Sequence, residues 1–284
     1  MRTVQFGTMG AVALLFAAGP ARAQETDTRG IVPEQFLKAR PAATGAAQAI
    51  HELRNGTPGG QIGVTIWRLR RSTPADSGAR ILVQEEEHSI EWTPERVSSS
   101  ARLAAGDRVR LTIESPARGY LYVVDRERYG SGEFGDPYLI FPTLRTRKGD
   151  NSVGPGKLID IPGQEDRPNF FSLHASRADQ SGEELTILVA PLPIDGLAIG
   201  RAAQVLSKEQ FLGWQKRWGT GKVDVFELPT GPGQSWTKAE QEAAAGGTRL
   251  LTQEDPPPQT VYRAVVKPGE PLLVKVELNY RRAR

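Results

Sequence analysis

The histidines of this chain, which could bind metals or transfer protons, are far apart in the sequence. They are His51, His88 and His174, and none has a second histidine at metal-ligand spacing. His88 follows three consecutive glutamates, a set that could face a hard cation. An exposed acidic strand edge that discourages aggregation explains the same run and is the favoured interpretation. The sequence therefore predicts no metal site.

Two glycine-containing stretches have the composition of catalytic loops but not their spacing. Gly219-Thr-Gly-Lys222 has lysine at position 216, where a phosphate loop needs glycine, and Val223 where it needs serine or threonine. Gly130-Ser-Gly132 lacks the G-x-S-x-G spacing of a nucleophile elbow. We expect the first stretch to end a helix and the second to be a loop tip, and we expect no cofactor.

Acidic residues near the middle of the chain are the remaining candidates for catalysis. Asp125, Glu127 and Asp136 could act as an acid/base pair only if the fold brought two of them together in a cleft. Acidic loop residues are common on protein surfaces. The sequence therefore favours a protein without catalytic residues and keeps a hydrolase as an alternative.

Aromatic and basic side chains around residues 119–148 could instead form a binding surface. Tyr120 and Tyr122 alternate with apolar residues, so they share one face of a strand, and this face is expected to be half-buried. A charged, glycine-rich loop follows, and loops on rigid β-scaffolds often carry binding. The candidate binding residues are Tyr120, Tyr122, Arg126, Arg128, Tyr129, Arg145, Arg147 and Lys148. For the basic run 145–148, a solvated loop is the default interpretation, and contact with an anionic envelope polymer is the alternative.

Short runs of alternating apolar residues, broken by Gly, Pro, Asn and Asp, predict the elements that would position these side chains. In the clearest run, Val109, Leu111 and Ile113 should face a core while Arg108 and Arg110 face water. Many short strands without regular strand–helix alternation are typical of a mainly β protein. We therefore expect an antiparallel β-sandwich or partly open barrel.

One or two short helices are expected near the C-terminus, within residues 201–247. Ser207-Lys-Glu-Gln210 and Thr237-Lys-Ala-Glu240 both match the capping box that begins a helix. The first helix should run to Trp218, with Phe211, Trp214 and Trp218 forming one buried stripe. Residues 260–279 should then form a β-hairpin around the turn Lys267-Pro-Gly-Glu270.

The N-terminus has the pattern of a secretory signal peptide. A basic start, an apolar segment at residues 11–18 and Ala21-Arg-Ala23 predict cleavage after Ala23. The mature chain would carry 34 basic and 33 acidic residues, and this nearly balanced charge does not indicate nucleic-acid binding. No apolar run is long enough to span a membrane. The chain has no cysteine, so an exported protein of this composition must be held together by packing.

These features predict the organisation of the whole chain. Residues 1–23 are the signal peptide, residues 24–60 a flexible or loosely packed arm, and residues 61–284 a single β-rich domain. The expected location is periplasmic or secreted.

Four segments in a fixed order resemble a known bacterial family. They are 105–114 (AGDRVRLTIE), 119–125 (GYLYVVD), 139–142 (LIFP) and 182–190 (GEELTILVA). Their order is similar to that of domain of unknown function 4384, over residues 98–194. The resemblance implies a β-rich module that is often found in exported proteins, and it brings no catalytic residues.

The sequence as a whole favours an exported, noncatalytic β-sandwich module that binds a protein or an envelope polymer. Two alternatives remain open. One is an extracytoplasmic hydrolase whose acidic residues converge only in the folded chain, and the other is a structural accessory subunit. A cleft with two close carboxylates would favour the enzyme, and a shallow aromatic patch would favour the binder.

Overall fold

The structure, a computed structural model, describes residues 28–43, 60–76, 78–85, 88–219, 221–228 and 231–281. The predicted signal peptide and parts of the predicted arm (residues 24–27 and 44–59) lie outside this set. No helix in the described ranges is long and apolar enough to cross a membrane.

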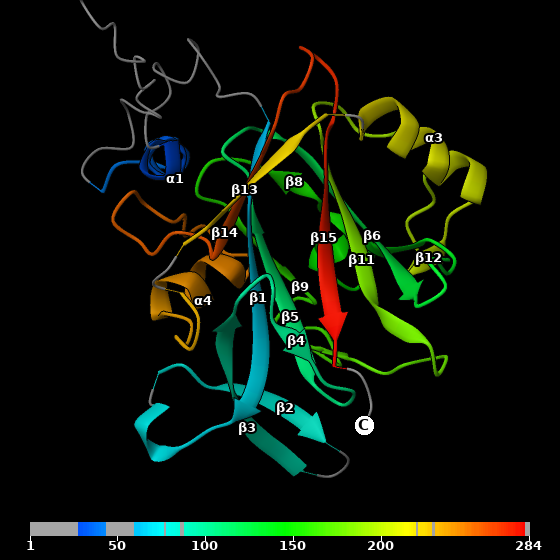
Figure 1. The fold of residues 1–284 in the computed structure, drawn as a ribbon. Coiled ribbons are helices and arrows are strands. Elements are labelled where there is room, and N and C mark those ends of the chain that lie inside the picture. The colour runs from blue at the N-terminus through cyan, green and yellow to red at the C-terminus, as the bar shows by residue number, and fades with distance from the viewer. Residues whose placement is uncertain are drawn as a thin grey trace, which may run out of the picture.

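Two β-sheets make up the fold, and together they form a sandwich rather than a closed barrel (Figure 1). Sheet A contains, in order, β10 (Phe171–Ser172), β5 (Arg108–Glu114), β1 (Gln61–Arg71), β14 (Thr260–Ala264) and β13 (Val223–Glu227), with β2 (Ile81–Glu85), β3 (His88–Val97) and β9 (Leu158–Ile161) attached. Sheet B contains β12 (Gln204–Val205), β7 (Tyr138–Phe141), β6 (Gly119–Tyr129), β11 (Gln180–Ala190), β15 (Leu272–Tyr280) and β4 (Arg102–Leu103), with β8 (Ser152–Val153) beside β6. The prediction of a mainly β sandwich is confirmed.

Apolar side chains at alternate strand positions fill the space between the sheets. Val109, Leu111 and Ile113 of β5 are buried in one cluster with Leu185 and Ile187 of β11. Because successive strand residues point to opposite faces, a period of two places a whole row of side chains in the core. The predicted inward face of β5 is therefore confirmed.

The opposite face of β5 differs from the prediction that its arginines face water. Arg110 is fully buried, its guanidinium forms an ion pair with Asp160 of β9, and it also donates a hydrogen bond to the carbonyl of Pro162 at 3.1 Å. The expectation for Arg110 was wrong because the outer face of sheet A is covered by other parts of the chain. An alternating pattern identifies the two faces of a strand but not what lies over each.

Helix α3 (Lys208–Trp218) covers the outer face of sheet B. The Ser207 side chain accepts a hydrogen bond from the Gln210 backbone N–H, as the predicted N-cap requires, and Gly219 ends the helix. Phe211 and Trp214 are buried against the sheet, while Trp218 is only partly buried and stacks on Trp214 with 6.1 Å between ring centroids.

Helix α4 (Lys238–Ala244) packs beside β9 and begins at the predicted capping box of Thr237 and Glu240. The Glu240 carboxylate also forms a buried ion pair with Arg96 of β3. Arg96 in turn donates to the carbonyl of Pro257 at 2.9 Å. This hydrogen bond holds the segment that follows α4 against sheet A.

Helix α1 (Thr28–Lys38) lies in the segment that the sequence assigned to a loosely packed arm. Its Val32 and Phe36 side chains are buried against Val261 of β14. Just after the helix, Arg40 is buried and contacts both carboxylate oxygens of Glu114 at 2.7 and 2.8 Å. Residues 28–43 are therefore packed onto sheet A, because they supply the counter-charge and the apolar cover that its outer face needs.

The last two strands do not form the predicted hairpin. The turn is present, since the Glu270 N–H donates to the Lys267 carbonyl at 3.0 Å. However, β14 pairs with β1 and β13 in sheet A, whereas β15 pairs with β11 and β4 in sheet B. Each strand has an inward row of apolar residues, and placing the strands in facing sheets buries both rows.

The stretch from Gly119 to Pro142 is a strand, a loop and a second strand. β6 and β7 pair antiparallel, and β6 continues to Tyr129, into the charged segment that the sequence assigned to a loop. This longer strand places residues 125, 127 and 129 on the inner face, in line with Leu121 and Val123 of the core. The inner face of β6 thus changes from apolar to acidic along its length.

Candidate functional site

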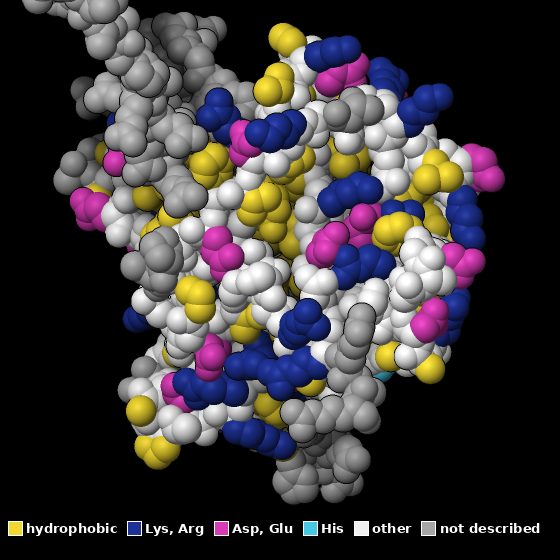
Figure 2. Space-filling model, in the orientation of Figure 1, with side chains coloured by type: hydrophobic (Ala, Val, Ile, Leu, Met, Phe, Trp, Pro, Cys, Tyr) yellow, Lys and Arg dark blue, Asp and Glu magenta, His cyan; other side chains and the backbone are white. Residues whose placement is uncertain are grey.

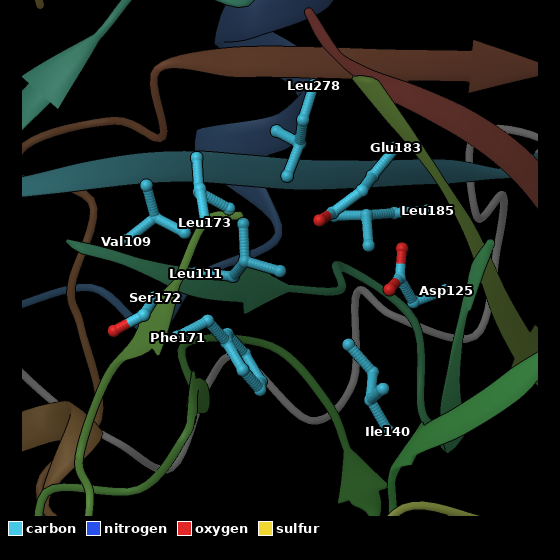
Figure 3. Close-up of a pocket in the computed structure, with 10 residues that line it drawn as sticks. All are labelled: Val109, Leu111, Asp125, Ile140, Phe171, Ser172, Leu173, Glu183, Leu185 and Leu278. Atoms are coloured by element: carbon cyan, nitrogen blue, oxygen red, sulfur yellow. The ribbon is translucent and has the colours of Figure 1, made fainter. Parts of the chain in front are cut away.

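A cavity of about 160 Å³ lies where the inner face of β6 becomes acidic, and it is lined by residues of both sheets. Most of its lining is apolar, including Val109 and Leu111 of β5, Ile140 of β7 and Phe171 of β10. Two carboxyl groups interrupt this lining, Asp125 of β6 and Glu183 of β11. In Figure 3 these two lie on one side of the cavity, with Val109, Ser172 and Leu173 on the other.

The register of the strands brings the acidic side chains together. β6 pairs with β11 so that Glu127 lies directly opposite Glu183, and Asp125 directly opposite Leu185. Like charges directly opposite each other on antiparallel strands destabilise a sheet. Tyrosine hydroxyls offset part of this cost, since Tyr280 donates to Glu183 and Tyr129 donates to Glu127.

Asp125 has the least support of these acidic groups. Its Oδ1 atom is buried and makes no hydrogen bond within the described residues. Burial raises the pKa of Asp125 well above its ordinary value, and the charges of Glu183 and Glu127 raise this pKa further. The backbone hydrogen bond of Arg126 acts in the opposite direction. A buried oxygen without a hydrogen bond is costly, and strongly shifted groups in a cavity indicate candidate functional sites.

The neighbouring acid is also shifted. Burial raises the pKa of Glu183, and so does the charge of Glu127, while the hydrogen bond from Tyr280 and the charge of His174 act in the opposite direction. Burial and the nearby Glu183 also raise the pKa of Tyr280. The carboxyl groups of Asp125 and Glu183 therefore bind protons more tightly than free carboxylic acids do.

We expect Asp125→Asn to make the protein more stable near neutral pH. The folded-state pKa of Asp125 lies above its unfolded value, so the native state holds a proton that the unfolded chain has lost. The free energy of unfolding therefore falls as pH rises through this window, and asparagine does not carry this penalty. Urea titrations should show a gain at neutral pH that shrinks toward about pH 4, where an unfolded aspartate is protonated as well.

The matched control is Asp136→Asn, which makes the same chemical change at an exposed residue. Its effect should stay within about ±0.5 kcal/mol. A loss of stability in Asp125→Asn at neutral pH would show that the native carboxylate is stabilised by contacts that the asparagine cannot make.

Similarity to known proteins gives no guide to this site. Comparison of the chain with protein-family models, curated proteins and solved structures finds no significant match.

The acidic residues that the sequence offered as candidates, Asp125, Glu127 and Asp136, do not share one site in the structure. Asp136 lies in the exposed loop and pairs with Lys208 at 2.9 Å, outside the cavity. Glu183, which sequence reasoning missed, takes its place beside Asp125. The signal for Glu183 was present, because it continues the inward row of Leu185 and Ile187 by one further position.

The tyrosines and arginines proposed from β6 lie on two different faces. Tyr120 and Tyr122 are packed under α3, where the Tyr122 hydroxyl accepts a hydrogen bond from the Ile194 backbone N–H at 2.9 Å. Arg126, on the same face, is buried and pairs with Glu184 at 2.5 Å.

The end of β6 carries two further candidates. Arg128 is partly exposed and pairs with Glu277 of β15. Tyr129 lies on the inner face, and the guanidinium of Arg177 lies 3.9 Å from its ring centroid.

The basic run after β7 is separate from these residues. Arg145 donates to the carbonyl of Arg167 at 2.5 Å, Arg147 lies 3.3 Å from the Asp150 carboxylate, and Lys148 is exposed. The structure therefore distributes the proposed binding residues over several surfaces instead of joining them into one.

Two surface features were not expected from the sequence. Lys and Arg side chains gather over the lower ends of β1 and β3 (Figure 2). In sheet A, Arg71 and Arg108 both lie about 4.5 Å from the ring centroid of Trp92. A hollow of about 320 Å³ also lies between α3 and the β14–β15 connection, with Trp218 in its wall. Each combines residues that are distant in the sequence, so local patterns gave no sign of them.

Proposed function

We propose that this protein is an exported, noncatalytic β-sandwich module that binds another protein or a component of the cell envelope, with the cavity beside Asp125 as its binding site. The observation that carries the proposal is the position of Asp125 in the lining of the cavity, together with a buried Oδ1 atom that makes no hydrogen bond within the described residues. A ligand in the cavity that donates to this carboxyl group would offset the cost of its burial. The resemblance to domain of unknown function 4384 and the signal-peptide pattern support export.

The size of the cavity favours binding over catalysis on a polymer. Sites for drug-sized ligands usually enclose about 300–1,000 Å³, whereas this cavity encloses about 160 Å³. A single side chain or a small headgroup fits that volume, and a polysaccharide or peptide backbone does not. The cavity is therefore suited to anchoring one group of a larger partner.

A hydrolase is the second candidate, because Asp125 and Glu183 share the cavity and both have raised pKa values. One protonated and one ionised carboxyl group could act as general acid and general base. For the protein to be a hydrolase, the scissile bond of its substrate must reach the carboxyl groups of Asp125 and Glu183.

The proposal is tested by capture from cell envelope material. The protein is recovered from the extracytoplasmic fraction of the producing cells, where mass spectrometry should find Gln24 at its N-terminus, and is then immobilised. A specific component should bind to the unmodified protein and to Asp136→Asn. Capture should be lost in Asp125→Asn and in Ile140→Trp, which fills the cavity from β7.

The outcomes separate the two candidate functions. Equal capture by all four proteins would place the binding site elsewhere and overturn the proposal. Recovery of the bound component in cleaved form, by the unmodified protein but not by Asp125→Asn, would establish the hydrolase instead. Thermal melting of each variant confirms that a loss of capture is not a loss of folding.

A further inference from the structure

We propose that the group bound in this cavity is the ammonium of an alkylamine, with its aliphatic chain against the apolar wall. This inference rests on the proposed function, since it names the chemistry of the group that the cavity anchors. It follows from the volume of the cavity, the two carboxyl groups on one side, Asp125 and Glu183, and the apolar side chains around them.

The volume limits the ligand to a few heavy atoms. An engineered apolar cavity of about 150 Å³ binds benzene, which has six, and this cavity encloses about 160 Å³. An ammonium group on a four-carbon chain has five heavy atoms. The cavity can therefore hold the end of a lysine side chain or a short free alkylamine.

The acceptors favour a donor that carries positive charge. Asp125 Oδ1 makes no hydrogen bond within the described chain, and Glu183 accepts one from Tyr280. None of the residues that the structure places in the cavity lining is a lysine, an arginine or a histidine. An ammonium has three donors and no acceptor, so it can donate to the carboxyl groups of the lining and offset the repulsion between them.

The apolar wall suits the chain behind the ammonium. Ile140 and Phe171 lie beside the cavity, and both are partly exposed. Lysine-type side chains bury their methylene groups against such surfaces while the charged end finds a polar partner. A small inorganic cation would leave this wall without a partner, and the described residues contain no group of three acidic or histidine side chains placed to hold a metal ion.

Binding should depend on pH, because the carboxyl group must lose its proton to pair with an ammonium. Other charged or titratable groups also act on Asp125 and Glu183. They are Glu127 of β6, Tyr280 of β15 and His174 after β10. Tyr129 donates to Glu127, and the Arg177 guanidinium lies over the Tyr129 ring. We therefore expect affinity to rise with pH across the range in which Asp125 ionises, and we expect binding to release protons.

The test is calorimetric titration of the mature protein with n-butylammonium at several pH values and in two buffers of different ionisation enthalpy. Binding should be weak, tighter at higher pH, and accompanied by proton release. Asp125→Asn should weaken it by about tenfold or more, because a hydrogen bond to a charged group is lost. Asp136→Asn should bind as the unmodified protein does.

Two further probes identify the chemistry and its source. n-Butanol has a similar size but no charge, and it should bind without the rise in affinity at higher pH. A short peptide containing one lysine distinguishes a protein side chain from a free amine. Binding of both the peptide and n-butylammonium indicates a side chain, whereas binding of n-butylammonium alone indicates a free amine.

Failure of this inference can be told apart from failure of the proposed function. If n-butylammonium and n-butanol bind equally, or neither binds, the cavity does not select an ammonium and the inference is wrong. The proposed function still stands in that case if Asp125→Asn and Ile140→Trp abolish capture of the envelope component. If capture is unaffected by both variants, the proposed function fails as well.

Discussion

Replacing Arg110 with alanine is expected to lower the free energy of unfolding by about 3–5 kcal/mol. The guanidinium is fully buried and pairs with Asp160, which is buried as well. Alanine would leave the Asp160 carboxylate without its counter-charge and would open space beside Trp236, whose ring centroid lies 5.7 Å from the guanidinium carbon. The shift should appear in the denaturant midpoint of a urea titration.

Two controls test the reason for this loss. Arg118 is exposed, so Arg118→Ala should change stability by no more than about 0.5 kcal/mol. The double variant Arg110→Met, Asp160→Leu removes both charges and should recover most of the loss, because an apolar pair can replace a buried ion pair at little cost. An equally large loss in the double variant would show that the shape of the arginine matters more than its charge.

Arg40→Ala is expected to cost a similar amount, again about 3–5 kcal/mol. Arg40 contacts both oxygens of the buried Glu114 carboxylate and also donates to the backbone carbonyls of Thr252, Asp255 and Pro256. Its loss leaves Glu114 uncompensated and releases the segment that joins α4 to β14. Urea titration measures the total loss, and hydrogen exchange should show faster exchange of the backbone amides of residues 251–255.

Lys38→Ala is the matched control, because Lys38 is exposed and only two residues away. It should change the free energy of unfolding by no more than about 0.5 kcal/mol. The exchange rates of residues 251–255 should then match those of the unmodified protein. If Arg40→Ala behaved like Lys38→Ala, residues 28–43 would contribute little to the stability of the sandwich.

Local patterns predicted much of this fold because they depend on neighbouring residues. Val109, Leu111 and Ile113 alternate with polar residues, and that alternation alone places them on one face. Ser207 and Thr237 begin helices because their side chains accept hydrogen bonds from backbone groups three residues later. Neither inference requires knowledge of what the element packs against.

The features that could not be predicted depend on contacts between distant residues. Arg110 has the sequence pattern of an exposed residue, but Asp160 lies fifty positions later and the two meet only because β5 pairs with β9. Glu183 meets Asp125 through the register of β6 and β11 in the same way. A single sequence contains no measure of such pairings.

The position of β15 affects the order in which the chain can fold. It is the last of the described strands along the chain, yet it lies inside sheet B, between β11 and β4. β14, the strand before it, occupies the corresponding place between β1 and β13 in sheet A. Until residues 260–280 have been synthesised, both sheets lack an inner strand, and contacts of such long range form slowly. Neither sheet can therefore be completed until the end of the described chain has been synthesised.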